Sequence, residues 1–268
     1  MIDGKQCTAL KELHEGNAPF VIPNPWDAGS ARVLEGVGFK ALATSSAGLA
    51  CTLGLSDGDI TLDDCLAHCR LVARATSIPV NCDFEDGFAA DPAEVAHNVL
   101  AVAHTGIAGC SIEDWSRDES RLYDFDHAVE RVAAAAEAAR SLGAFQLTAR
   151  AENLLRGVDD LDDTVRRLQA FADAGAHVLY APGIRSLDDL RSVTTELDRP
   201  FNVLGSFFPD ATLTELADAG AHRISLGSAL NWVSIGALHR AARAMLDDGS
   251  MTWLAEAAEA TGVRKYLG

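Results

Sequence analysis

The 268-residue sequence predicts an α/β fold, a (β/α)8 TIM barrel with extra C-terminal helices, on three observations. Eight short apolar segments alternate with helical patterns, as this barrel requires. Glycine ends three helical patterns just before a strand, at Gly38, Gly175 and Gly220. The motif G-x-G-x-x-G is missing after the first strand, which disfavours the alternative of a doubly wound sheet. No internal linker or low-complexity segment appears, so we expect residues 1–268 to form one domain.

Taken in order, the elements follow from apolar periodicity and helix-end signals. We expect strands at 20–23, 40–45, 80–83, 109–113, 145–150, 177–180, 201–204 and 222–226. We expect helices at 5–15, 28–37, 61–76, 92–105, 126–142, 160–174, 186–197, 211–219, 228–246 and 250–262. Asp27 and Thr61 are placed to cap the helices that follow them. The segment after the second strand reads as a long loop rich in glycine and serine.

Composition limits the classes of partner. The net charge of -17 argues against a nucleic-acid surface or an anionic membrane. A small anionic carboxylate substrate remains compatible, because a local metal or arginine inverts the field. No apolar run is long enough to span a membrane, and Met1–Thr8 contains no apolar signal segment. The six cysteines lack the spacing of a disulfide scaffold, which indicates a reducing, cytoplasmic setting.

One helix carries two of those cysteines. Cys65, His68 and Cys69 could share a helical face and bind a metal. No fourth ligand lies nearby in the sequence, which disfavours zinc.

The most informative stretch is P-V-N-C-D-F-E-D-G-F, residues 79–88. Alternation along a strand places Asn81, Asp83 and Glu85 on one face and Cys82 on the other. Neighbouring carboxylates at a buried strand end repel one another, so a cation or a reaction would explain them. The alternative is a turn at Asp86-Gly87 with its acids in water.

Other strands end in residues of the same kind. The fourth predicted strand ends in Glu113 and the fifth in Arg150, and Asn202 lies on the seventh. In this barrel the carboxyl ends of the strands form the active site. Asp83, Glu113 and Arg150 would therefore meet at one ligand, and oxygen donors favour Mg²⁺ or Mn²⁺. Small residues Ser45-Ser46-Ala47-Gly48 offer backbone N–H groups to a carboxylate or an oxyanion.

These segments together resemble the isocitrate lyase/phosphoenolpyruvate mutase superfamily. The resemblance covers most of the chain: residues 24–39 (N-P-W-D-A-G-S-A-R-V-L-E-G-V-G-F), 43–50, 79–88, 109–114, 148–153 and 223–230. It implies a TIM barrel whose last helix can be swapped between subunits, and a homo-oligomer, a tetramer or dimer. It also implies Mg²⁺ and 2-oxo or 2-hydroxy acid substrates.

The resemblance further implies roles for individual residues. Asp83 corresponds to the direct metal ligand, and Asp57, Glu85 and Glu113 to carboxylates that hold metal-bound waters. The substrate carboxylate would meet the Ser45–Gly48 segment, and Arg150 would contact the substrate, with Asn202 as a further substrate-binding candidate. The catalytic candidates are Arg150, Ser45 and Tyr123.

The sequence departs from the resemblance after the fourth strand. The isocitrate and methylisocitrate lyases carry K-[KR]-C-G-H there, whereas this chain reads D-W-S-R-D-E-S-R-L-Y-D-F. We expect a Mg²⁺-dependent carbon–carbon lyase that acts on a small 2-oxo or 2-hydroxy di- or tricarboxylate through an enolate. The cleavage would be retro-aldol, retro-Claisen or a decarboxylation, with solvent, Tyr123 or another group as the proton source. The alternatives are phosphorus–carbon chemistry of the mutase or hydrolase type and a non-catalytic protein that binds a 2-oxo acid.

Overall fold

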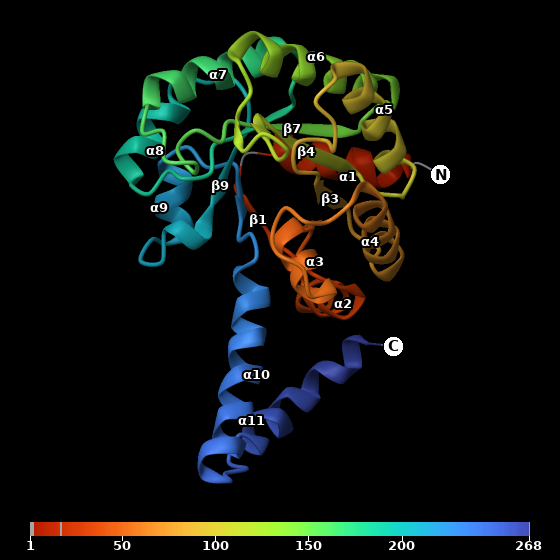
Figure 1. Cartoon of the computed structure of the whole chain (residues 1–268), viewed down its shortest axis with the longest axis vertical. Coiled ribbons are helices and arrows are strands. Elements are labelled where there is room, and N and C mark those ends of the chain that lie inside the picture. Colours follow the sequence, from red (N-terminus) through yellow and green to blue (C-terminus); the bar gives the residue numbers. More distant parts are fainter. Residues whose placement is uncertain (1–2, 17, 268) are drawn as a thin grey trace.

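The computed structural model describes residues 3–16 and 18–267 and confirms the predicted barrel (Figure 1). Eight parallel strands form one sheet in the order β1-β10-β9-β8-β7-β4-β3-β2. The Ala43 amide of β2 donates to the carbonyl of Pro23, just after β1, at 3.1 Å, so the sheet is nearly closed. The strands are β1 (Phe20–Ile22), β2 (Leu42–Ala43), β3 (Val80–Asp83), β4 (Gly109–Glu113), β7 (Gln146–Arg150), β8 (Val178–Tyr180), β9 (Phe201–Leu204) and β10 (Arg223–Ser225).

The helices pack against the barrel, apart from the last two, which lead away from it. They are α1 (Gly4–Glu15), α2 (Ala28–Val37), α4 (Leu62–Ala75), α5 (Pro92–Ala103), α6 (Phe125–Ser141), α7 (Leu161–Asp173), α8 (Leu187–Thr194), α9 (Leu213–Asp218), α10 (Ala229–Asp248) and α11 (Leu254–Glu259). Local signals explain the ends of α2 and α4. Asp27 and Thr61 cap them with capping boxes, and Gly38 ends α2 at a φ of 118° that favours glycine.

Two segments differ from the sequence expectation. The predicted glycine- and serine-rich loop contains a helix, α3 (Ser46–Leu53), which Ser45 caps and left-handed Gly54 ends. Small residues that we interpreted as loop-forming are therefore the end signals of a short helix. The segment after β4 contains a small antiparallel hairpin, β5 (Trp115–Ser116) and β6 (Arg121–Leu122). Two-residue strands are too short for sequence periodicity to reveal.

The two faces of the barrel strands differ in chemistry. Cys82, Cys110 and Leu147 point outward and are fully buried beneath the helices. The inward face carries polar side chains that are also buried, including Asn81, Ser111, Thr148, Asn202 and Arg223. The hydrophobic core therefore lies mainly between the sheet and its helices, and the barrel interior is polar.

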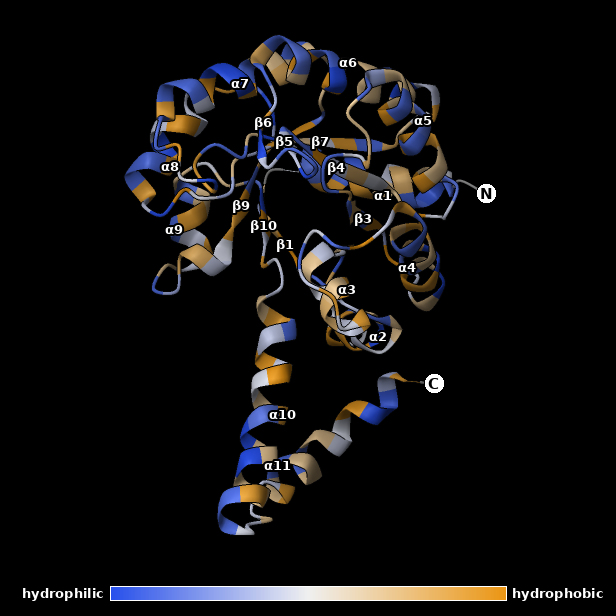
Figure 2. Cartoon of the chain, in the orientation of Figure 1, coloured by the Kyte–Doolittle hydropathy of each residue, from blue (hydrophilic) through white to orange (hydrophobic). Residues whose placement is uncertain are grey.

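The C-terminal segment forms an arm outside the barrel. Figure 1 shows α10 leading away from the strands, with α11 and the short helix η2 (Ala260–Tyr266) turning back toward α2. Figure 2 shows hydrophobic and hydrophilic residues interleaved along α10. Several large apolar side chains of the arm are exposed: Trp232, Val233, Leu238, Met245, Leu246, Met251 and Leu254. Among the described residues, no helix is both long enough and apolar enough to span a membrane.

Candidate functional site

A cavity of about 430 Å³ opens at the carboxyl ends of the strands. This main cavity is lined by residues from most of the barrel, among them Asn24, Ser45, Ser46, Ala47, Asp57, Asn81, Asp83, Ser111, Arg150, Tyr180, Asn202, Arg223, Ser225 and Trp232. Its size lies within the range of small-molecule sites. Its position is the one predicted from the barrel topology.

Arg150 is the electrostatic centre of the site. Its Nη1 lies 2.8 Å from Asp83 Oδ1, and its Nη2 lies 3.1 Å from Glu113 Oε2. Nε and Nη2 both contact Glu152 Oε1, at 3.0 and 2.8 Å. Burial disfavours the charged guanidinium, yet these three carboxylates together raise the pKa of Arg150 well above its usual value. The predicted convergence of Asp83, Glu113 and Arg150 is thus what the structure shows.

The first turn of α3 faces the same carboxylate. Ser46 donates to Asp83 Oδ2 through its amide at 3.1 Å and its hydroxyl at 3.0 Å. The Ser45 hydroxyl lines the cavity but accepts the Gly48 amide, so it is engaged as a helix cap. Ala47 also lines the cavity, and its N–H at a helix start has no intrahelical partner. Gly48 stays behind the cavity wall, where an added Cβ would lie 3.2 Å from Trp26 Cβ.

A side cavity of about 380 Å³ adjoins the main one and shares Ser46, Asp57 and Arg150 with it. Glu85, Glu113 and Arg156 also line this side cavity. Burial raises the pKa of Glu85 to about 8, although Arg117 opposes that shift. Burial, with Glu152 next, also raises the pKa of Glu113. Such perturbed acids in a cleft are typical of functional sites.

Arg117, which also lines the side cavity, contacts three loops around it. Its Nη1 lies 2.8 Å from Glu85 Oε2, in the loop after β3. Its Nη2 donates to the carbonyls of Gly58 and Ile60, in the loop after α3, at 2.7 and 2.8 Å. Arg117 itself belongs to the β5–β6 hairpin after β4. The hairpin is therefore fixed over the side cavity.

The residues present fit a hard divalent cation. The atoms available as metal ligands beside Asp83 are carboxylate, hydroxyl or carbonyl oxygens, which Mg²⁺ and Mn²⁺ prefer. Glu85 Oε1 is buried without a hydrogen-bond donor among the described residues, whereas Glu85 Oε2 and Glu152 Oε2 contact only Arg117 and Arg156 in ion pairs. Buried acceptors of this kind suit the waters that Mg²⁺ retains.

Besides Gly48, two more predicted site residues are placed differently from the rest. Tyr123 is not among the residues lining either cavity; its hydroxyl lies 3.5 Å from Asp86 Oδ2, and Arg131 stacks on its ring at 4.0 Å. Asn202 does line the main cavity, but its amide is held within the barrel. The Asn202 side-chain oxygen accepts from Arg223, and its nitrogen donates to Ser225 at 3.0 Å.

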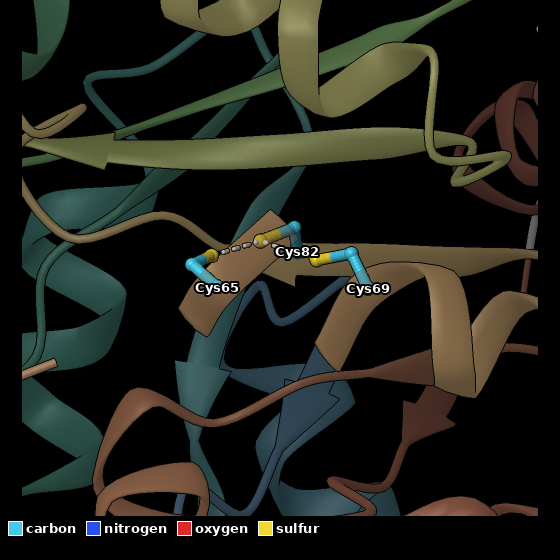
Figure 3. A group of neighbouring side chains, drawn as sticks. All are labelled: Cys65, Cys69 and Cys82. Atoms are coloured by element: carbon cyan, nitrogen blue, oxygen red, sulfur yellow. Dashed lines mark hydrogen bonds between the residues drawn. The ribbon is translucent and has the colours of Figure 1, made fainter. Parts of the chain in front are cut away.

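The cysteines gather on the outer face of β3. Figure 3 shows the side chains of Cys65, Cys69 and Cys82 next to one another. Cys82 Sγ lies 3.6 Å from Cys65 Sγ and 3.3 Å from Cys69 Sγ. All three side chains are buried between α4 and the sheet, as expected for small core residues. His68 does not join them, since its Nε2 lies 3.1 Å from the carbonyl of Trp26. The group of three neighbouring sulfur ligands thus contains Cys82 and not His68, and the metal site of Cys65, His68 and Cys69 that the sequence disfavoured does not form.

Sequence reasoning missed several residues of the site. Glu152, Arg156 and Tyr180 surround Arg150 or its acids, and Arg223 lies deeper in the barrel. The alternation of β10 could have placed Arg223 inward with Ser225. Arg156 lies in the loop after β7, whose side-chain directions have no period to read.

The chain is similar to known proteins in sequence and in fold. The sequence model of the phosphoenolpyruvate phosphomutase family matches residues 10–246. The 2-methylisocitrate lyase of Escherichia coli K12 is 30% identical over 191 residues, 68% of this chain and 64% of that enzyme. A protein from Burkholderia cenocepacia J2315, named only provisionally as a lyase/mutase, is 44% identical with a TM-score of 0.94, covering 98% of this chain and 96% of its own.

A further solved structure links fold and chemistry. It is a 2,3-dimethylmalate lyase described as a member of the same superfamily, 28% identical with a TM-score of 0.84, covering 98% of this chain and 95% of its own. The relatives therefore include both lyases and mutases. On the family match and the matching barrel, the chain belongs to the isocitrate lyase/phosphoenolpyruvate mutase superfamily.

Proposed function

We propose that the protein is a Mg²⁺- or Mn²⁺-dependent carbon–carbon lyase acting on a small 2-oxo or 2-hydroxy di- or tricarboxylate. The observation that carries this proposal is the cluster of Asp83, Glu113 and Glu152 around Arg150 at the strand ends. The similarity to a methylisocitrate lyase and a dimethylmalate lyase supports the same reaction class. An oxaloacetate acetylhydrolase solved with the product oxalate, 25% identical with a TM-score of 0.84, supports a 2-oxo acid substrate.

In this proposal Asp83 holds the cation directly, and Asp57, Glu85 and Glu113 hold its waters. The cation would stabilise the negative charge of an enolate when a carbon–carbon bond breaks beside it. Arg150 and the Ala47 amide would bind the substrate carboxylate, with Ser45 fixing the turn that presents this amide. Because Tyr123 lies behind Asp86, we assign protonation of the enolate to water rather than to this side chain.

A proton-NMR screen with Mg²⁺ tests the proposal. The panel would contain oxaloacetate, isocitrate, methylisocitrate, dimethylmalate, oxalomalate and phosphonopyruvate. We expect one carboxylate substrate to be cleaved by the wild-type protein and not by Asp83→Ala. If no member of the panel is cleaved but a 2-oxo acid shows line broadening that depends on Asp83, the protein binds 2-oxo acids without catalysis.

Phosphorus–carbon chemistry is the second candidate, because the matching family model is that of phosphoenolpyruvate phosphomutase. Phosphonopyruvate in the same screen, followed by ³¹P NMR, separates the two. Formation of phosphoenolpyruvate would establish a mutase, and formation of inorganic phosphate would establish a hydrolase. Either result would overturn the lyase proposal.

We also propose that the arm is an interface between copies of the chain, in a dimer or tetramer. Its exposed apolar residues would bury their surface there, and α11 would be the segment exchanged between subunits. Leu246→Lys, at a side chain that is 78% exposed, should lower the mass measured by light scattering. Arg191→Met on α8 is the control; a monomeric wild-type protein would contradict this part.

A further inference from the structure

The main cavity continues below the carboxylate cluster into the barrel interior. Its deeper wall is formed by inward-facing polar residues, Asn81, Ser111, Asn202, Arg223 and Ser225. TIM barrels usually fill this space with branched apolar side chains. A polar and partly open interior is therefore a feature that this chain maintains against the usual pattern of packing.

Arg223 brings a positive charge to this floor without a carboxylate beside it. Its side chain is 3% exposed. Its three hydrogen bonds go to neutral groups: Nε donates to Asn202 Oδ1 at 2.7 Å, Nη2 donates to Thr148 Oγ1 at 3.2 Å, and Nη1 lies 3.2 Å from His14 Nε2. Within residues 3–16 and 18–267, no carboxylate oxygen lies within 4.0 Å of its nitrogens.

The neighbouring groups do not neutralise this charge. Burial lowers the pKa of Arg223 to about 10, so the guanidinium remains charged at neutral pH. Burial, and next the charge of Arg223, lower the pKa of His14 to about 3, so the imidazole is neutral and accepts. The other arginines of the site differ in this respect, since Arg117 and Arg150 each contact carboxylates. A buried charge without a partner is unfavourable unless an anion completes it.

Unused hydrogen-bonding groups beside Arg223 also indicate that an anion binds here. A guanidinium has five N–H donors, and three of them are engaged here. Asn81 Oδ1 is likewise buried in this wall without a donor among the described residues. An anionic group with an adjacent hydroxyl or water would satisfy both sets.

The position of Arg223 relative to the Asp83–Arg150 cluster can be judged along strand β7. Arg223 bonds Thr148, which is two residues before Arg150 on the same face of β7. Two residues along a strand span about 7 Å. A short carbon chain carrying a carboxylate at each end fits that separation.

We infer that Arg223 binds a second carboxylate of the substrate and so selects dicarboxylates over monocarboxylates. This inference rests on the proposed function, because the first carboxylate is the one held beside Asp83 and Arg150. Arg223 is then a specificity residue placed on the opposite side of the substrate from the bond that breaks.

The test is isothermal titration calorimetry, with Mg²⁺ present, on pairs of ligands that share a carbon skeleton. One pair is 2-oxopentanoate and 2-oxoglutarate; the other is 2-oxobutanoate and oxaloacetate. We expect wild-type protein to bind the dicarboxylate of at least one pair about 10- to 100-fold more tightly, as a charged hydrogen bond predicts. Arg223→Gln keeps a donor but loses the charge, so its preference should fall to about threefold or less.

Controls separate selectivity from structure. Arg223→Lys should keep part of the preference, and Arg191→Met on exposed α8 should keep all of it. If Arg223→Gln weakens the binding of both members of a pair equally, Arg223 has only a structural role and the inference is overturned. Equal wild-type affinity for both members also overturns it while leaving the proposed function intact. Absence of any 2-oxo acid binding would instead contradict the proposed function itself.

Discussion

The two faces of β3, β4 and β7 carry different chemistry within the same strands. On the inward face Asp83, Glu113 and Arg150 form a charged cluster beside the cavities. On the outward face Cys82 and Cys110 are fully buried beneath the helices. Successive side chains along these strands therefore point alternately into the polar cavities and into the apolar core.

The two faces contribute differently to the free energy of folding. Outward side chains stabilise the fold through burial and close packing. Inward charges are expensive to bury and are retained where they bind a ligand. Substitutions on the inner face should therefore reduce turnover, and substitutions on the outer face should reduce stability.

The largest effect is expected at Asp83. Asp83→Ala removes the proposed metal ligand and should lower kcat/KM by about 1,000-fold or more. Its free energy of unfolding should change by no more than about 1 kcal/mol, because Arg150 keeps Glu113 and Glu152. Steady-state kinetics and urea unfolding measure the two quantities. Asp198→Ala, at a side chain that is 81% exposed, is the matched control and should change neither.

Arg150 is the exception among the inner-face residues, because its substitution should lower stability as well as turnover. Arg150→Met leaves Asp83, Glu113 and Glu152 without their shared cation, so both turnover and stability should fall. We expect a loss of about 3–5 kcal/mol in the free energy of unfolding without metal, measured in urea. Saturating Mg²⁺ should restore part of that loss. Unchanged stability would show that the acids are protonated or hydrated rather than paired.

On the outer face, Cys82→Leu overfills the contact with Cys65 and Cys69. The free energy of unfolding should decrease by about 1–3 kcal/mol, while kcat per folded molecule stays within twofold of wild type. Chemical denaturation and active-site titration measure these values. Cys51→Leu, at a partly exposed cysteine, is the control. A loss of turnover without a loss of stability would show that Cys82 acts on Asp83.

His14 tests the floor, where the inner face meets α1. Its pKa of about 3 in the folded protein lies below the ordinary value, so folding favours the neutral ring. The stability that this provides is complete above the unfolded pKa of about 6.5 and is lost as pH falls, by about 1.4 kcal/mol per unit. Between pH 7 and pH 5, His14→Gln should show about 2 kcal/mol less loss of stability in urea. Equal pH dependence of the two proteins would mean that His14 is protonated in the fold.

Sequence predicted the barrel because its elements carry strong local signals. The bounds of β3, β4 and β9 were predicted residue for residue, and Asp27 and Thr61 cap the helices as expected. It also predicted the meeting of Asp83, Glu113 and Arg150, since strand ends share one edge. It could not reveal α3 or the β5–β6 hairpin, whose short segments have little periodicity. Nor could it show that Tyr123 lies behind Asp86, because the direction of a loop side chain depends on distant packing.

Arg117 links the loops that follow β3, α3 and β4 through one guanidinium. Because the three loops share this one guanidinium, displacing any of them requires contacts of Arg117 to break. A substitution that moves one of these loops therefore also disturbs the positions of the other two.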